Sequence, residues 1–230
     1  MAIKKDVDRH RHPGRYILTG SADVLTVPRL AGSPAGRMEV LTLWPLSMGE
    51  IKGTTENVVD GFFEEEFPQR CRPDPDFDLG ANVLAGGFQE TLQRKAPRRR
   101  GAWFESYLTT ILGRDIRDLS KILNLAALPR LLALLAGRIA SLQNQSELSR
   151  ASGIPNATLT RHMAVLQDTF LVRLLPAWSS SPGKRLVKTP MFMVDTGLAC
   201  HLMGMDLAGF LRGGELAGRV FENFVVLELF

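Results

Sequence analysis

The pattern of residues 142–188 constrains the fold of this chain most. It predicts two short helices, a tight turn between them and a basic hairpin after them. Asn144 precedes the first helix and Glu147 follows three residues later, which is the spacing of a capping box. Ser152 and Gly153 then interrupt the helical pattern. This order of elements predicts a winged helix-turn-helix.

The second helix is expected to start near Pro155 and to expose a polar face. Its apolar residues Leu159, Met163 and Leu166 follow the i, i+4, i+7 spacing of one buried face. In DNA-binding members of this architecture, the outward N-terminal part of the second helix enters the major groove and reaches phosphates and base edges. The candidate DNA-binding residues of this helix are Asn156, Thr158, Thr160 and Arg161.

The hairpin is expected to form the wing. Residues 170–176 and 185–194 read as two strands, and the Ser-, Pro- and Gly-containing residues 179–183 read as the turn between them. The basic residues beside this turn complete the set of DNA-binding candidates: Lys184, Arg185 and Lys188. A winged helix can equally be a packing module that joins domains or partners, because a fold does not determine a function. Both interpretations stay open at this point.

Composition excludes several classes of protein. With 45% hydrophobic residues, the 230-residue chain can bury a substantial core, and its formal charge of +4 is compatible with a nucleic-acid partner. Cys71 and Cys200 are too few for a disulfide framework, and neither has a CxxC partner for zinc. We therefore expect a cytoplasmic protein without a metal site. No apolar run has the length needed to cross a bilayer, so we expect no membrane partner.

Apolar runs near both ends lack the elements that should cover them. Residues 15–21 read as a buried strand of a parallel sheet, and residues 38–46 as a second, more amphipathic strand. The βα units that normally flank such strands are absent from the sequence. Residues 221–230 read as an apolar helix or strand whose covering partner is also missing.

Four segments carry a resemblance to a known family. They are GRYILTGSADVLTVPRLAGSPAGRMEVLTLWPLSMGEI (14–51), LAGGFQE (84–90), RRRGAWFESYLTTILGRDIRDL (98–119) and KTPMFMVDTGLACHLMG (188–204). In this order they resemble a prokaryotic AAA-superfamily ATPase family that carries a C-terminal domain of unknown function. The resemblance implies an N-terminal P-loop domain, a central winged helix and a C-terminal region similar to restriction-endonuclease-like folds. This chain looks like the middle of such a protein.

The expected fold class is α+β, mostly helical, in which the remnant of a P-loop ATPase sheet precedes helices and the winged helix-turn-helix. The expected segments are 1–53 (C-terminal part of the ATPase core), 54–97 (helical lid or linker), 98–204 (helical scaffold and winged helix) and 205–230 (start of a truncated nuclease-like region). A wide apolar stripe predicts the scaffold helix: Leu128, Leu131, Leu132, Leu135, Ile139 and Leu142.

The resemblance also implies roles for two residues. Ser21 would be the sensor residue near the γ-phosphate, and Arg37 a sensor or finger arginine that stabilises transition-state charge. Arg37 can equally pair with a carboxylate on a surface loop. ATP and magnesium would be the cofactors of the intact family. No G-x-x-x-x-G-K-[ST] string occurs, since the nearest one has Arg219 for Lys and Val220 for the hydroxyl residue. We therefore expect no autonomous ATP hydrolysis, no tightly bound cofactor, and assign no cofactor-binding residue.

The expected function is that of a fragment of an AAA-type ATP-binding protein whose winged helix docks DNA or a partner. One alternative is a non-catalytic truncated remnant. The other is an interaction module that assembles with itself or with a full-length ATPase and lends Ser21 or Arg37 across the interface. A basic cluster before Trp103 suits a phosphate backbone or an acidic partner, or is simply solvated: Arg94, Lys95, Arg98, Arg99 and Arg100.

Overall fold

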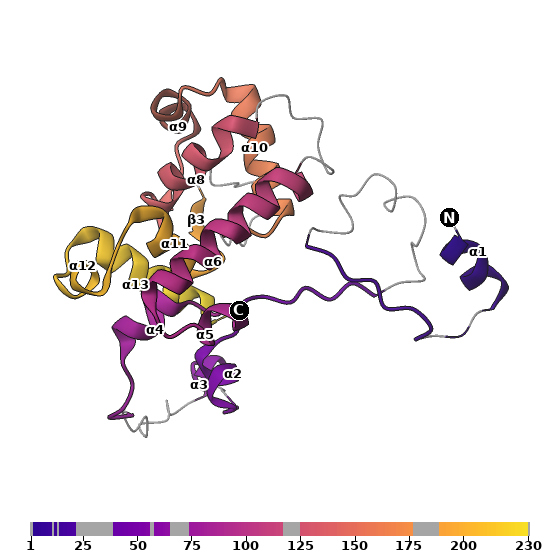
Figure 1. Cartoon of the computed structure of the whole chain (residues 1–230), viewed down its shortest axis with the longest axis horizontal. Coiled ribbons are helices and arrows are strands. Elements are labelled where there is room, and N and C mark those ends of the chain that lie inside the picture. Colours follow the sequence, from indigo (N-terminus) through magenta and orange to yellow (C-terminus); the bar gives the residue numbers. More distant parts are fainter. Residues whose placement is uncertain are drawn as a thin grey trace.

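A computed structural model describes residues 2–10, 12, 14–21, 39–55, 58–64, 74–116, 125–176 and 189–229. Helices predominate, and three short strands form one antiparallel sheet in the order β1-β3-β2. The expected class, α+β and mostly helical, is confirmed. Figure 1 shows most of the helices gathered in one body, with the N-terminal residues and α1 (Ala2–Arg9) extending away from it.

Two of the predicted helices form the helix-turn-helix. They are α9 (Gln145–Ser152) and α10 (Asn156–Asp168). The Asn144 side chain caps α9 by accepting a hydrogen bond from the backbone N–H of Glu147. Gly153 ends α9 with a φ of 71°, a left-handed conformation that glycine adopts without a steric penalty. The chain therefore turns where the sequence predicted.

The sheet consists of β1 (Ser141–Leu142), β2 (Val172–Leu174) and β3 (Pro190–Met193). With α8 (Leu128–Ala136) before β1, the order α8-β1-α9-α10-β2-β3 is that of a winged helix-turn-helix. The predicted strand 170–176 is shorter than expected, because Phe170 has a φ of 53° and belongs to the turn after α10. The expected turn of the wing, with Lys184, Arg185 and Lys188, lies outside the described residues.

Helix α11 (Thr196–Met203) packs against helices from several parts of the chain. This helix contacts α4 (Leu79–Ala85), α6 (Pro97–Thr110), α8 and α13 (Glu215–Leu227). The shorter elements are α2 (Met48–Lys52), α3 (Val58–Gly61), α5 (Gln89–Leu92), the π-helical turn Ile111–Asp115, the 3-10 turn Leu125–Ala127 and α12 (Leu207–Leu211). A single apolar cluster joins these helices to the winged helix, and it extends along the chain from Met48 to Phe224.

The predicted apolar stripe of the scaffold helix is correct except at its end. Leu128, Leu131, Leu132, Leu135 and Ile139 are fully buried. Leu142 is 61% exposed, and its inclusion in the stripe was wrong. Because α8 ends at Ala136, the helical spacing no longer applies to a residue that lies in β1.

The prediction of a buried strand over residues 15–21 was wrong. Ile17 is 89% and Leu18 50% exposed, and no sheet pairing includes this run in the part of the chain that the structure describes. Before this run, residues Ala2–Arg9 form the helix α1, whose Asp6 carboxylate accepts a hydrogen bond from the Tyr16 hydroxyl, 2.5 Å away. An apolar run is buried as a strand only where neighbouring strands and covering helices meet it.

Residues 38–46 were also expected to form a strand, and the described residues 39–46 do not. Leu41 and Leu43 are 78% and 94% exposed. The chain enters the body at Trp44, whose ring packs edge-on against Phe170 with centroids 5.5 Å apart. Leu46 then donates its N–H to the carbonyl of Gly87 over 2.8 Å.

Beyond Trp44 the chain meets its own C-terminal helix. The backbone N–H of Met48 donates to a Glu228 carboxylate oxygen, 2.8 Å away and 180 residues later in the sequence. Near the C-terminal end of the described chain, residues Glu215–Leu227 form α13. Residues 221–227, which were expected to form a helix or a strand, are therefore helical. On α13, Phe221 and Val225 remain 43% and 41% exposed, and Leu229, just after this helix, is 46% exposed.

Candidate nucleic-acid interface

The N-terminal half of α10 presents most of the predicted polar residues to solvent. Asn156, Thr160 and Arg161 are exposed, and Thr158 is half-buried. The side-chain amide of Gln145, at the start of α9, donates to the Thr160 hydroxyl oxygen and to the Asn156 carbonyl. The two helices are therefore linked by polar contacts at the end where they meet. No described residue pairs with the Arg161 guanidinium.

The winged helix carries an excess of positive charge. Residues 125–176 contain five arginines, against the acidic Glu147 and Asp168. Arg138 pairs with Glu147 at 2.9 Å. Arg130, Arg150 and Arg161 are exposed, and none of them forms an ion pair within the described ranges.

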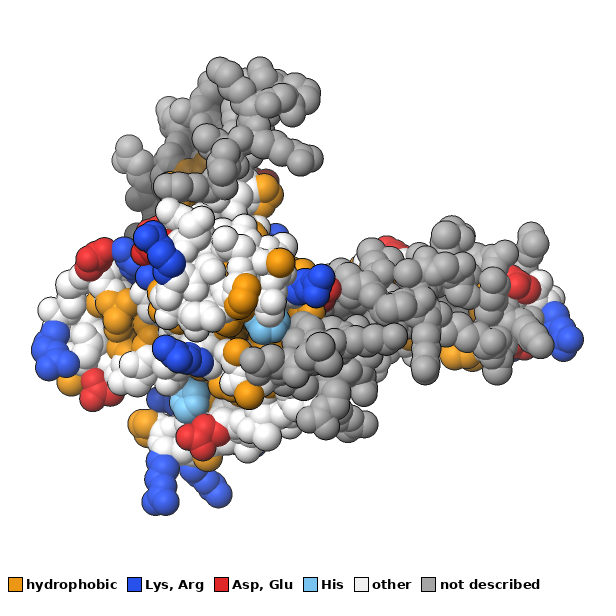
Figure 2. Space-filling model, turned by 90° about the horizontal axis from the view of Figure 1, so that it is seen from above, with side chains coloured by type: hydrophobic (Ala, Val, Ile, Leu, Met, Phe, Trp, Pro, Cys, Tyr) orange, Lys and Arg blue, Asp and Glu red, His pale blue; other side chains and the backbone are white. Residues whose placement is uncertain are grey.

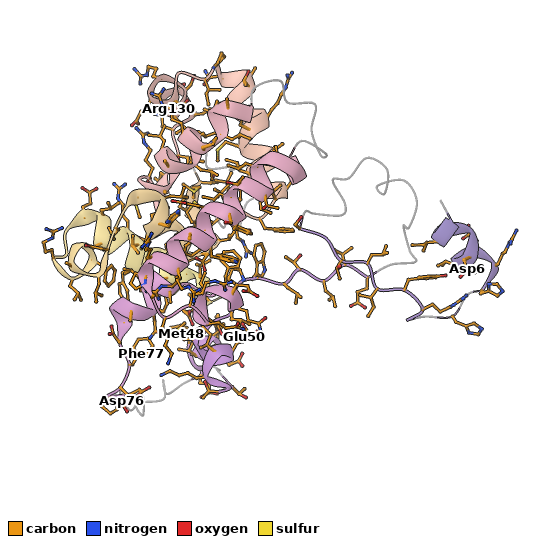
Figure 3. All side chains as sticks on the ribbon, in the orientation of Figure 1. Asp6, Met48, Glu50, Asp76, Phe77 and Arg130 are labelled. Carbon is orange, nitrogen blue, oxygen red and sulfur yellow. The ribbon has the colours of Figure 1, made fainter. Side chains whose placement is uncertain are left out.

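These arginines are spread over one end of the molecule. Figure 2 looks down on the end that carries α9 and α10, and shows separate basic side chains between patches of other types. Figure 3 places Arg130 beside α9 at this end. The positive charge at this end is divided among separate side chains and does not form one continuous patch.

Sequence reasoning missed several residues of this surface. Gln145, Arg130 and Arg150 lie on α9 and α8, outside the helix that the pattern singled out. The sequence could have indicated the residues on α9. In DNA-binding helix-turn-helix proteins the first helix crosses the DNA backbone, so its polar residues are candidates as well as those of the second helix.

His162 is a second residue that the pattern did not reveal. It lies on the inner face of α10, 1% exposed, and neither ring nitrogen has a hydrogen-bond partner in the part of the chain that is described. Burial lowers the pKa of its imidazole. Its polarity is thus directed into the core and not toward a ligand.

Of the two residues implied by the ATPase resemblance, the structure describes Ser21 alone. Ser21 is exposed and follows the irregular run 16–20, while Arg37 lies outside the described residues. Within the described ranges, no group of three His, Cys, Asp or Glu side chains could hold a metal ion. Nor do those ranges contain a helix with the length and apolar character that spanning a membrane requires.

Two of the resemblance segments meet at Asp195. This side chain is 1% exposed and accepts N–H groups from Leu198 at 2.6 Å and from Gly87 at 2.7 Å. It therefore caps α11 and holds the turn after α4. Burial raises the pKa of its carboxyl to about 6, although these backbone hydrogen bonds oppose the rise. A Cβ atom at Gly86, whose φ is 69°, would lie 2.3 Å from the carboxylate oxygens.

The cavity beside Asp195 is small. It is lined in part by Trp44, Met48, Arg173 and Glu228, and encloses about 30 Å³. That volume holds about one water molecule, whereas ligand pockets are roughly tenfold larger or more. The arrangement fixes the packing of α4 against α11 and is not a substrate site.

Comparison with known proteins gives relatives but no solved structure that matches. The chain is 27% identical over 224 residues to an uncharacterized protein of Mycobacterium bovis, Mb2031c, and equally to one of Mycobacterium tuberculosis, Rv2008c. These alignments cover 97% of this chain but 46% of each relative, so the chain spans about half the length of the curated relatives that it matches.

A family described as "Domain of unknown function (DUF8612)" matches residues 77–208, which include α4, α6, the winged helix and α11. Because this match covers more than half of the 230 residues, the chain belongs to the family DUF8612.

Proposed function

We propose that this chain docks a longer protein onto duplex DNA through the N-terminal half of α10. The observation that carries the proposal is the exposed face formed by Asn156, Thr160 and Arg161 at the start of the second helix of a helix-turn-helix. Amide and guanidinium groups can form paired hydrogen bonds with adenine and guanine edges in the major groove. Arg130 and Arg150, which are also exposed, supply positive charge for nearby phosphates.

The test measures binding of a fluorescently labelled 30-base-pair duplex by anisotropy at several salt concentrations. Arg161→Ala should weaken binding about tenfold, since one good side-chain contact to a base is worth roughly 1–3 kcal/mol. If Arg161 contacts a phosphate instead, the slope of log affinity against log salt should fall by about 0.9.

The matched control is Arg212→Ala, which removes the same charge from an exposed residue after α12. It should bind DNA like the original chain. A flat salt response, or equal losses for the Arg161 and Arg212 variants, contradicts the proposal.

We also propose that the longer protein is an AAA-type ATPase, in which ATP and magnesium act outside this chain. The four-segment resemblance supports this. The isolated chain should then neither hydrolyse ATP nor gain thermal stability from MgATP. A saturable rise of the melting temperature with MgATP would contradict this division of roles.

Exposed apolar residues favour a second candidate, an interaction module that assembles with a full-length ATPase. Ile17, Leu41 and Leu43 are 78–94% exposed, which is a common property of surfaces that another chain covers. Under this candidate, Arg37→Ala should abolish stimulation of the partner's ATPase, and Arg161→Ala should leave it intact. The reverse pattern supports DNA docking.

A further inference from the structure

A second cationic surface lies at the start of α6, outside the winged helix. Lys95, Arg98 and Arg99 are exposed, Arg100 is half-buried, and the first turn of α6 contains no acidic residue. The neighbouring Arg94 is neutralised by Glu90, 2.6 Å away. Among the residues with described positions, no carboxylate forms an ion pair with any of the other four cations.

An aromatic stack continues from this cationic surface along the same helix face. Arg99, Trp103 and Tyr107 are spaced by four residues, so their side chains lie in one row. The Trp103 and Tyr107 rings are nearly parallel, at 12°, with centroids 5.2 Å apart. Phe88 packs against both rings at 5.4 and 5.1 Å.

The aromatic stack packs against the protein core on one side and is partly exposed to solvent on the other. Phe104, 2% exposed, packs edge-on against Trp103 with centroids 5.3 Å apart. Trp103 and Tyr107 themselves are half-buried, so part of each ring reaches solvent. A partly exposed aromatic row beside four cations that form no ion pair within the described chain is more than solubility requires.

We propose that this α6 surface, formed by Lys95, Arg98, Arg99, Arg100, Trp103 and Tyr107, binds single-stranded nucleic acid. Cations that follow a phosphate backbone and aromatic rings that stack with bases are the two components of such sites. An acidic peptide would use the cations and leave the rings unused. A duplex keeps its base faces stacked on one another, out of reach of the rings.

This surface is separate from the face of α10. Figure 1 shows the start of α6 beside α4 and α5, away from α9 and α10. The inference therefore does not depend on duplex binding by α10, and a variant of either surface should leave the other unchanged.

The experiment uses the full chain with Trp44→Phe and Trp178→Phe, which leaves Trp103 as its only tryptophan. Titration with a 15-nucleotide oligo(dT) should quench Trp103 emission to a plateau. The Arg98→Ala/Arg99→Ala double variant should weaken binding and lower the slope of log affinity against log salt by about 1.4, because each single-strand phosphate contact contributes about 0.7. Tyr107→Leu should weaken binding about tenfold through loss of stacking, with its melting temperature measured alongside.

Arg212→Ala is the control, and it should not change oligo(dT) binding. Three results would overturn the proposal. Polyglutamate binding as tightly as oligo(dT) would identify an acidic protein partner. A 15-base-pair duplex whose binding is weakened by Arg98→Ala/Arg99→Ala as much as oligo(dT) binding is would mean backbone contact alone. Oligo(dT) binding that persists in the Arg98→Ala/Arg99→Ala variant would place the site elsewhere.

Discussion

Asp195 and His162 are both almost fully buried, but they differ in their hydrogen-bond partners. The Asp195 carboxylate accepts the backbone N–H of Leu198, three residues later in the sequence, and that of Gly87, 108 residues earlier. The His162 ring has no partner among the residues that are described. Because an unpaired buried polar group costs about 1–3 kcal/mol, the two side chains should act on stability in opposite directions.

Asp195→Asn should destabilise the protein by about 2 kcal/mol, measured by urea unfolding at pH 7. The oxygen of the new Asn side chain can accept one of the two N–H groups. Its NH₂ group then faces the other N–H, of Gly87 or Leu198, and two donors cannot form a hydrogen bond. The control is Asp206→Asn, which changes the exposed cap of α12. Asn caps helices as well as Asp does, so the control should change stability by less than about 0.5 kcal/mol.

The contribution of Asp195 to the free energy of unfolding should also depend on pH. Its pKa is raised from 3.8 to about 6 by burial, so the folded state holds a proton that the unfolded state releases. The stability linked to that proton is complete below pH 3.8 and is lost as pH rises through about 6. Each tenfold difference in proton affinity corresponds to about 1.4 kcal/mol. The stability difference between the original chain and Asp195→Asn should therefore shrink between pH 4 and pH 7, and a constant difference would contradict this.

His162→Leu should stabilise the protein by about 1 kcal/mol at pH 7.5, because an apolar side chain of similar size removes two unpaired polar atoms. Burial lowers the pKa of His162, so stability is lost as pH falls below its ordinary value of 6.5 and the unfolded chain takes up the proton. The variant should lack this loss in urea unfolding at pH 5.5. His12→Gln, an exposed substitution, should retain it.

At the scale of the element, one helix side chain completes the sheet. Met193 pairs with Val172 on one side of β3, and β1 reaches only Met191 and Pro190 on the other. The buried Asn223 of α13 fills the remaining place, since its oxygen accepts the Met193 N–H at 2.8 Å and its amide donates to the Met193 carbonyl at 3.1 Å. A helix thus takes the place of a strand at this position.

Asn223→Asp should destabilise the protein by about 2 kcal/mol, because the donor to the Met193 carbonyl becomes a second acceptor. Hydrogen exchange of the Met193 amide should become faster than in the original chain, since α13 no longer holds that edge. Glu222→Gln changes the neighbouring exposed residue of α13 and serves as the control. Equal exchange in both variants would mean that Asn223 does not hold the edge.

Local signals made the helix-turn-helix predictable, and distant contacts made other elements unpredictable. Asn144 and Gly153 set the ends of α9 through contacts within a few residues, so the sequence pattern located them. Leu142 and the run 15–21 have apolar patterns too, but their exposure depends on where α8 ends and on which elements cover them. A pattern of apolar residues indicates what can be buried and does not supply the covering partner.

At the scale of the whole molecule, the same distinction applies to the candidate site. The exposed face of α10 followed from helical spacing, because its buried side is fixed by Leu159 and Leu166. The contact of Gln145 with Thr160, and that of Asp195 with Gly87, depend on how elements pack, so spacing within one element could not reveal them.

The apolar cluster from Met48 to Phe224 should behave as one cooperative unit, and the residues before Trp44 should be dispensable to it. Limited chymotrypsin treatment should cut early after Leu41 or Leu43, which are highly exposed. The remaining body should melt within about 4 °C of the intact chain, a change of roughly 1 kcal/mol. Early cuts within α6 or α11, identified by mass spectrometry, would contradict a single unit.

The hydrogen bond between Met48 and Glu228 brings the entry and exit of this unit to one point. A unit whose two ends meet can be inserted into a loop of another protein without separating the flanking residues of that loop. Joining Glu228 to Trp44 through a short glycine-rich linker and opening the chain at the exposed Gly213 between α12 and α13 should therefore yield a circular permutant with the same core.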